Sequence, residues 1–326
     1  MSEAAQPQTI FRRPLFVLLR WLAALLLLAL LFHFIPFAPL RTALSRVPPS
    51  RFVIVLLLYF LALTVAIAKW HLVVNAAGAA LPFSASTQCF ASGLFGDLFL
   101  PSVIGGDIAR LAVGISRSAR PAAVVTGNVA DRLLDAGAQI SLVLAGFILL
   151  PSALPAALQI PARRILLFLA AGVLLALGLL FFLHRPLLQG RSRRFRRGLA
   201  QVRHSLRSVS RRPRLLLAGF LLGLAIQSSY ILLTFYVSHS CGLELPLRVW
   251  FFAWPLAKFA ALLPITQGGI GVRETAFVVL LVPFGAPAAL VLATGIVWEG
   301  VILAGGLSAG LAAFLLRTLE PPRTRR

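Results

Sequence analysis

Long apolar runs recur along the chain, and each is close to the length of a membrane-spanning helix. The uninterrupted runs cover residues 14–35, 52–74, 122–150, 165–184, 214–239 and 287–316. A helix needs about 20 mostly apolar residues to cross the hydrocarbon core of a bilayer. The short alternating segments that are typical of a membrane β-barrel are absent from the sequence. The pattern therefore predicts an all-α, polytopic membrane protein.

Two further apolar stretches, at 86–120 and 248–284, are interrupted by glycine and proline. Each contains the pattern P-x-x-x-G-G-x-x-x-R, at residues 101–110 and again 163 positions later at 264–273. Paired interrupted segments in the two halves of a chain are typical of inverted-repeat transporters. We therefore predict two re-entrant helical hairpins, while a Gly-Gly pair in a membrane helix can also serve only as a close-packing site.

Composition and charge agree with a membrane protein. The chain is 59% hydrophobic and 12% charged, with a mean hydropathy of +0.92, whereas a soluble domain is roughly a quarter charged. The net charge of +22 is concentrated, because eleven arginines lie between Arg185 and Arg214 and others lie near both termini. Basic residues beside spans mark the cytoplasmic side and attract anionic lipids. This placement argues against nucleic acid as a partner.

The basic loop at 185–214 selects the topology. If the N-terminus is cytoplasmic and 86–120 is a hairpin, the basic loop and the C-terminus are cytoplasmic as well. Residues 1–326 then form a single transmembrane domain of six spanning helices plus two re-entrant hairpins. Its inverted repeats cover about 14–150 and 165–316. An alternative splits 248–284 into two short crossings, which gives eight crossings and the same termini.

Charged residues inside the apolar segments are the candidate functional residues, because a charge at bilayer depth costs about 2.5–3.5 kcal/mol. The acidic and basic candidates are Asp97, Asp107, Asp131, Glu274, Glu299, Arg110, Arg132, Lys258 and Arg273. The backbone N–H groups at Gly105, Gly106, Gly268 and Gly269 add donors of the kind that bind anions at helix N-termini.

We expect these residues to surround a polar cavity between the hairpins. Arg110, Arg273 and Lys258 would hold a phosphate there. The acidic residues would balance these charges, or bind a cationic headgroup or a coupling proton.

Motifs for enzymes, metals and cofactors are absent from the sequence. There is no H-E-x-x-H, no G-x-S-x-G and no phosphate-binding P-loop. The histidines are scattered, and Cys89 and Cys241 stand alone in apolar surroundings. We predict a protein that is not an enzyme and binds no metal or cofactor. Transport would run downhill, use an ion gradient, or be driven by consumption of the product. Four tryptophans are interpreted as interface anchors or packing residues: Trp70, Trp250, Trp254 and Trp298.

The two interrupted motifs resemble the signatures of the lysylphosphatidylglycerol synthase transmembrane-region family, and the resemblance covers nearly the whole chain. The matching residues are Gly96-Asp97, Pro101, Gly105-Gly106-Asp107, Arg110 and Asp131-Arg132 in the first half, and Pro264, Gly268-Gly269-Ile270-Gly271 and Arg273-Glu274 in the second. In that family the domain is linked to flipping aminoacylated phosphatidylglycerol. Stand-alone relatives are associated with hopanoid, glycolipid or cell-envelope lipid pathways.

The resemblance implies a lipid flippase or transporter in a bacterial inner membrane, acting on a phosphate-containing, aminoacylated or glycosylated envelope lipid. Anionic or aminoacylated phospholipids, glycolipids and hopanoids all fit as the lipid partner. The sequence ends at Arg326, shortly after the last apolar run, so we expect no aminoacyl-transferase domain and no synthesis of lysylphosphatidylglycerol. The alternative is a non-transporting membrane partner of a lipid-modifying enzyme or glycosyltransferase, with the basic loop at 185–214 as its docking surface.

Overall fold

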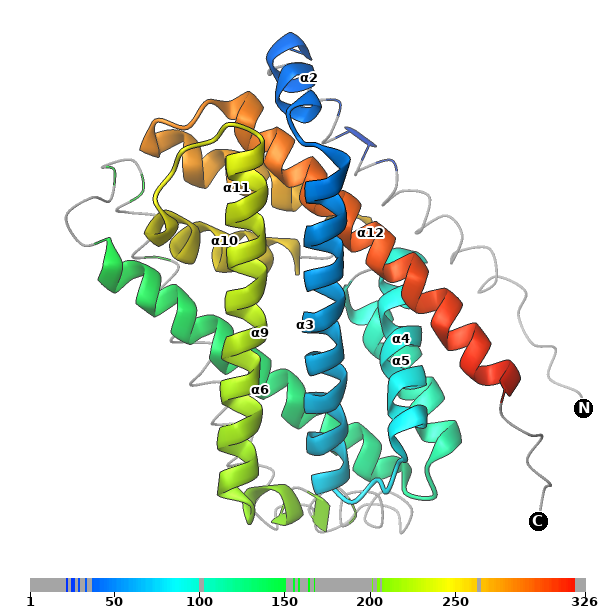
Figure 1. The fold of residues 1–326 in the computed structure, drawn as a ribbon. Helices are drawn as coiled ribbons and strands as arrows, with labels where there is room; N and C mark the ends of the chain where they lie inside the picture. The colour runs from blue at the N-terminus through cyan, green and yellow to red at the C-terminus, as the bar shows by residue number, and fades with distance from the viewer. Residues whose placement is uncertain are drawn as a thin grey trace, which may run out of the picture.

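A computed structural model describes the chain continuously over residues 37–99, 103–150, 207–262 and 265–319, and at single positions within 22–33, 155–167 and 201–205. All regular secondary structure in these residues is helical (Figure 1), so the all-α prediction is confirmed. Apart from those single positions, the expected spans at 14–35 and 165–184 and most of the basic loop at 185–214 lie outside the described residues.

Four helices are long and apolar enough to cross a bilayer, and each coincides with a span expected from the sequence. They are α3 (Pro49–Ala76), α6 (Pro121–Leu149), α9 (Pro213–Ser240) and α12 (Ala288–Leu319). Three of them begin with proline, whose fixed φ suits the first position of a helix and whose missing N–H costs nothing there. At 1.5 Å per residue each helix is about 42–48 Å long, which exceeds the roughly 30 Å hydrocarbon core. The polytopic membrane fold is therefore confirmed.

Helix α3 shows how these helices serve both the protein interior and lipid. Its buried side chains recur every three or four positions, and include Val55, Tyr59, Ala62, Leu63, Ala66, Lys69, Trp70 and Val73. On its other side, Leu57, Leu58 and Leu61 are 46–63% exposed. A helix that is apolar all round suits a membrane, and the buried series contains one charge, Lys69.

The first interrupted stretch forms a helical hairpin. Helices α4 (Phe83–Phe99) and α5 (Val103–Arg117) pack against each other beside α3. They are about 25 Å and 22 Å long, which is short for a crossing. The Asp97 carboxylate near the end of α4 accepts a hydrogen bond from the backbone N–H of Gly106 in α5, at 3.0 Å. This bond joins the two arms close to their connection.

The second interrupted stretch contains α10 (Leu247–Ala261), a 3-10 turn at Gln267–Gly269, α11 (Val272–Leu281) and a second 3-10 turn at Val282–Phe284. The two α-helices are about 22 Å and 15 Å long. Neither has the roughly 20 residues that a crossing needs. Their lengths favour a hairpin over the alternative with two crossings.

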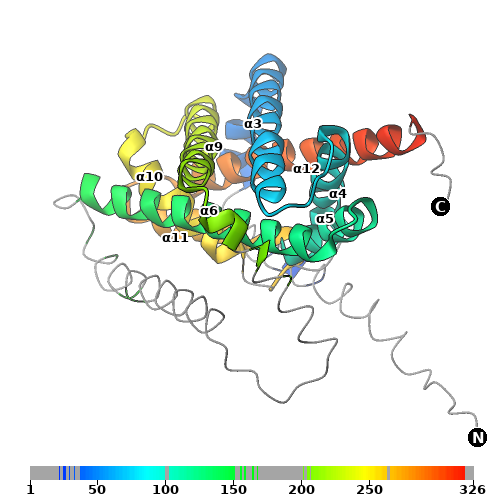
Figure 2. The same ribbon diagram turned by 90° about the horizontal axis from the view of Figure 1, so that it is seen from below.

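The two hairpins lie on opposite sides of the central pair formed by α3 and α9 (Figures 1 and 2). Helix α6 packs against both central helices and against α10. Helix α12 contacts α3, α9, α4 and α11, so it joins the two hairpins to the centre. A short helix, α2 (Phe37–Ser45), also contacts α12. The sequence pattern missed α2, because its residues lie between the apolar runs at 14–35 and 52–74.

The two Gly-Gly motifs have different structures, although their spacing is the same. Gly268 and Gly269 lie at the break itself, with φ of 62° and 78°, which favours glycine. Gly105 and Gly106 instead lie inside α5, and Gly93 and Gly96 lie inside α4. The expectation that glycines such as Gly105 and Gly106 interrupt the first stretch was therefore wrong. A Cβ on Gly106 would overlap the carboxylate of Asp97, so this glycine permits close packing of the hairpin arms.

We expect Gly310→Ala to destabilise the protein, because the added Cβ would overlap the ring of Phe95 where α12 meets α4. Overpacking of this kind costs about 1–3 kcal/mol. Thermal unfolding in detergent would measure it. Gly300→Ala is the matched control on the same helix, since its Cβ would lie 3.6 Å from Phe52, an ordinary contact. Equal unfolding temperatures for the two variants would contradict the tight α4–α12 contact.

Candidate functional site

A cavity of about 250 Å³ lies inside the protein where α3, the α4–α5 hairpin, α6, α9, α10 and α12 converge. Nine charged side chains line it, five basic and four acidic: Lys69, Arg110, Arg132, Lys258, Arg273, Asp97, Asp131, Asp135 and Glu299. Only 12% of the residues are charged, and many of these charges surround this one interior space. Charges at membrane depth usually face such a cavity and pair with one another.

Most of the predicted site residues come together at this cavity. Those that line it are Asp97, Arg110, Asp131, Arg132, Lys258, Gly268, Arg273 and Glu299. Asp107 and Glu274 do not line it, and each contacts a cationic residue that does. Gly105, Gly106 and Gly269 also do not line it. Their positions indicate packing within the hairpins, since a Cβ at Gly269 would lie 2.8 Å from Ala261.

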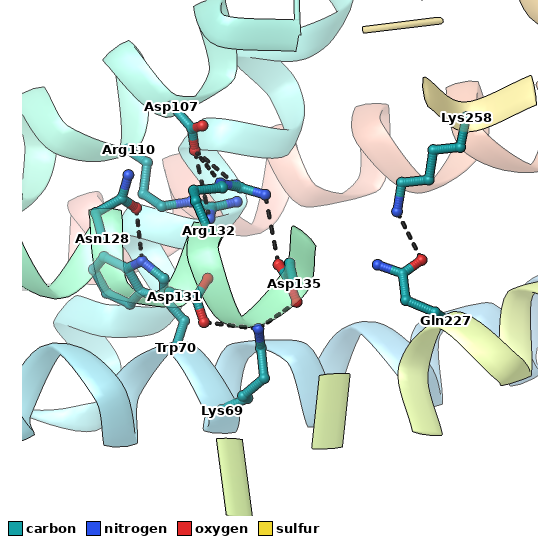
Figure 3. A network of polar contacts seen from close by, with 10 residues as sticks. All are labelled: Lys69, Trp70, Asp107, Arg110, Asn128, Asp131, Arg132, Asp135, Gln227 and Lys258. Atoms are coloured by element: carbon teal, nitrogen blue, oxygen red, sulfur yellow. Dashed lines mark hydrogen bonds and ion pairs between the residues drawn. The ribbon is translucent and has the colours of Figure 1, made fainter. Parts of the chain in front are cut away.

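The first group of charges joins α3, α5 and α6 (Figure 3). The ammonium of Lys69 lies 2.8 Å from Asp131 and 2.5 Å from Asp135, so it bridges two carboxylates one helical turn apart. Lys69 and Asp131 are 2% and 1% exposed. Arg132 contacts Asp107 on α5 at 2.7 Å and Asp135 at 3.7 Å. These shared contacts keep each of the carboxylates compensated in a medium of low dielectric constant.

The second group of charges joins α11 to α12. Arg273 forms an ion pair with Glu299 and lies 3.6 Å from Glu274. The Glu274 carboxylate also accepts a hydrogen bond from the backbone N–H of Gly271, at 2.7 Å. This bond caps α11 in the manner of a capping box, and the carboxylate suits the positive end of the helix dipole. Glu274 therefore has a structural role at the start of α11.

Arg110 is buried without a close carboxylate. It is 3% exposed, and its nearest acidic partner is Asp107, at 3.8 Å. Its guanidinium group lies over the ring of Phe90, 4.0 Å from the centroid, and 5.9 Å from that of Trp70. Its Nε and Nη1 atoms have no hydrogen-bond partner among the described residues. A buried donor without a partner is costly, so these atoms have the capacity to bind an acceptor.

Lys258 has a polar partner that is neutral. Its ammonium donates a hydrogen bond to the amide oxygen of Gln227 on α9, at 2.7 Å. It lies 5.2 Å from the centre of the Trp254 ring and 5.8 Å from that of Tyr230. Within the described residues no carboxylate pairs with it. Lys258 and Arg110 are therefore the lining cations that have the greatest capacity to bind an anion.

Aromatic side chains form one wall of the cavity, and the sequence did not predict this. Tyr59, Tyr230, Trp254 and Trp298 line it, with successive ring centroids 5.5–6.0 Å apart. Trp254 and Trp298 are buried here, at 4% and 2% exposed, which does not fit anchors at the membrane surface. Their interpretation as packing residues fits better.

Three further residues that line the cavity were not predicted as site residues from the sequence: Lys69, Asp135 and Gln227. A signal for the first two was available, since Lys69 is one of only two lysines in the chain and Asp135 lies one turn after Asp131. No feature of the local sequence distinguished Gln227. Among the described residues, no group of three or more acidic, histidine or cysteine side chains could hold a metal ion, and Cys89 and Cys241 are free and buried, as expected.

The fold and the cavity define a polytopic helical membrane protein with a charged, aromatic-walled cavity among its helices. The family model described as the lysylphosphatidylglycerol synthase TM region matches residues 17–310. The chain belongs to this family, so the resemblance to the family is confirmed. The family places the protein among membrane proteins of lipid-related envelope processes. A search of curated proteins found no match.

We expect Lys69→Met to destabilise the protein strongly, because it leaves Asp131 and Asp135 buried without their shared cation. Removing one partner of a buried ion pair costs about 3–5 kcal/mol. Denaturant unfolding in detergent would measure the loss. The double variant Lys69→Met/Asp131→Asn should recover part of it, since one uncompensated charge is removed as well. A single variant as stable as the wild type would show that the cluster does not stabilise the fold.

Proposed function

We propose that the protein is a lipid flippase or lipid transporter that moves an envelope lipid between leaflets, with the headgroup in the charged cavity and the tails in the bilayer. One observation carries the proposal: Arg110 and Lys258 line an interior cavity and lack a close carboxylate partner. A phosphate group brings the negative charge and the acceptor oxygens that these two side chains lack. Family membership supports a lipid as the source of that phosphate.

The cavity cations that could bind a phosphate differ in whether a close carboxylate already holds them. Arg110 has two donors without partners and can bind a phosphate without breaking an ion pair with a close carboxylate. Lys258 can exchange the neutral Gln227 for an anion. Arg273 is held by Glu299, so it contributes only if this ion pair opens. Arg273 thus suits a later step of transport better than initial binding.

The remaining groups fit a headgroup that is more than a phosphate. Asp97 lines the cavity, and its Oδ1 accepts a hydrogen bond from the backbone N–H of Gly106, at 3.0 Å. Glu299 also lines it. These carboxylates could receive a cationic group or a coupling proton. The aromatic wall of Tyr59, Tyr230, Trp254 and Trp298 offers faces to a cation or to a sugar ring.

The two hairpins supply a basis for alternating access. Each consists of helices too short to cross the membrane, and they lie on opposite sides of the central helices (Figure 2). In inverted-repeat transporters, one repeat moves against the other around a fixed midplane site. We place the repeats at about 14–150 and 165–316. The termini and the basic loop then lie in the cytoplasm and the protein in a bacterial inner membrane.

We expect Arg110→Gln and Lys258→Gln each to slow lipid movement in proteoliposomes about tenfold or more, since each removes a charge-assisted hydrogen bond to phosphate worth about 1.5–3 kcal/mol. A leaflet-specific assay with a labelled phospholipid would measure the rate. Arg248→Gln is the matched control, because it removes one exposed cation from the same helix as Lys258. Wild-type rates in both cavity variants, with normal folding, would contradict the site. No lipid movement by the folded wild-type protein would favour the non-transporting partner function instead.

We expect the two ends of α9 to face opposite compartments, with Ser210 in the cytoplasm and Glu244 outside. Both residues are exposed and lie just beyond the helix. A membrane-impermeant maleimide should label Glu244→Cys in intact cells, and Ser210→Cys only after permeabilisation. The native cysteines are buried, so their background should be low. The reverse labelling pattern would overturn the proposed orientation.

A further inference from the structure

One of the four carboxylates that line the central cavity differs from the other three. Those of Asp131, Asp135 and Glu299 each form an ion pair with a lysine or arginine. Asp97 forms no ion pair with any described residue. An ionised carboxylate inside a membrane protein is costly when no cation pairs with it, and protonation removes this cost. Asp97 is therefore the lining acid with the greatest capacity to take up a proton.

The hydrogen bond of Asp97 is compatible with both of its protonation states. Its Oδ1 accepts the backbone N–H of Gly106 at 3.0 Å. A Cβ on Gly106 would overlap this carboxylate, so glycine lets Asp97 reach the backbone of α5. A proton on Oδ2 leaves the bond to Oδ1 in place. Asp97 can thus gain or lose a proton while the two arms of the hairpin stay joined.

The cation Arg110 lies along the same part of α4 as Asp97. A Cβ on Gly93 would lie 3.0 Å from Nε of Arg110, and Gly93 precedes Asp97 by one helical turn. Arg110 is the cation with the largest electrostatic effect on Asp97, although the two form no ion pair. Its Nε and Nη1 have no hydrogen-bond partner among the described residues. Arg110 can therefore bind an anion close to Asp97.

Other charged and titratable groups near Asp97 come from several helices. They are Asp107 on α5, Arg132 on α6, Tyr59 on α3 and Glu299 on α12. The 3-10 turn Gln267–Gly269, which also packs against α4, contains no titratable side chain. Both acids in this set are already held by arginine. The balance between Asp97 and Arg110 is therefore the one that an incoming phosphate changes most.

A phosphate bound to Arg110 favours protonation of Asp97. It brings a second negative charge into the same space, and a nearby like charge disfavours the ionised form of a carboxylate. By linkage, a phosphate that promotes proton binding is itself bound more tightly when the proton is present, by the same factor. A cationic headgroup at Asp97 would instead lie near the guanidinium of Arg110 and be repelled.

We propose, on the basis of the lipid transport proposed above, that Asp97 binds the proton that is coupled to this transport. It takes up one proton from water as the lipid phosphate binds Arg110, and both ligands leave on the other side of the membrane. A lipid with one phosphate charge and one proton carry no net charge together. A pH gradient therefore drives the movement, and the membrane potential does not. The ion pair of Glu299 with Arg273 leaves Asp97 as the proton site.

An imposed pH gradient tests this coupling. The full chain is reconstituted in phosphatidylcholine vesicles with a trace of fluorescent phosphatidylglycerol, and valinomycin with equal potassium on both sides holds the potential at zero. A membrane-impermeant quencher reports the leaflet of the label. With one proton per lipid, we expect a gradient of one pH unit to shift the leaflet ratio about tenfold towards the alkaline side. At equal pH the label should distribute evenly.

Variants of Asp97 separate the proton from the structure. Asp97→Asn keeps an oxygen that can accept the Gly106 N–H, and it resembles the protonated acid. It should still equilibrate the label, at a changed rate, but give an even ratio under the gradient. Asp97→Glu keeps a titratable carboxylate and should retain the gradient response. Glu244→Gln is the matched control, because it neutralises an exposed acid that does not line the cavity. Asp97→Ser serves if Asp97→Asn does not fold.

Binding gives a second readout that does not require transport. The affinity of the detergent-solubilised protein for short-chain phosphatidylglycerol is measured by the fluorescence of the cavity tryptophans. It should rise as the pH falls through neutrality, by up to about tenfold per pH unit, since the proton and the phosphate bind together. The affinity of Asp97→Asn should stay constant, because the phosphodiester itself remains ionised over this range.

The outcomes distinguish the coupling from the transport. A gradient response that survives in Asp97→Asn would overturn the proposal, and so would a wild-type protein that moves the label but ignores the gradient. A folded wild-type protein that moves no label, yet binds the lipid more tightly at low pH through Asp97, would contradict the transport function and support the proton site. Loss of both readouts in the wild type would contradict both.

Discussion

The structure depends on the pairing of charged side chains among its central helices. At the centre of the helices, the ammonium of Lys69 contacts Asp131 and Asp135, and Arg132 joins Asp135 to Asp107. Lys69 joins α3 to α6, and Arg132 joins α6 to α5, so one network fixes α3, α5 and α6 relative to one another. Apolar packing in lipid gives little preference for one helix partner over another. Paired charges give that preference, because a mispaired arrangement would leave a charge uncompensated.

Much of the fold follows from hydropathy, because the bilayer imposes one requirement on every span. The apolar runs predicted the starts of three long helices to within a few residues, and these helices begin at Pro49, Pro121 and Pro213. The hairpins could also be predicted, from the interruptions in otherwise apolar stretches. Helix α2 was not predicted, although proline is tolerated in the first turn of a helix and does not by itself exclude one.

The candidate site was predicted in part, and the gaps have physical causes. Intramembrane charge identified Arg110, Lys258, Glu299 and Asp131, since charge is costly at that depth. It could not separate the glycines at 105 and 106, which pack inside α5, from those at 268 and 269, which make a turn. A Gly-Gly pair can either pack inside a helix or form a turn, and which of the two occurs depends on the helix that packs against it. The aromatic wall could not be predicted, because tyrosine and tryptophan in apolar runs also serve as packing residues and interface anchors.

The two lysines have a consequence of their own. The chain uses arginine for its other basic residues, and both Lys69 and Lys258 line the central cavity. A compact ammonium can contact two carboxylates at once or move between partners, which a planar guanidinium does less readily. The ε-amino groups of the whole chain are thus confined to one interior space. An amine-directed reagent that enters the cavity would therefore report its opening and closing in the native protein, without any engineered residue.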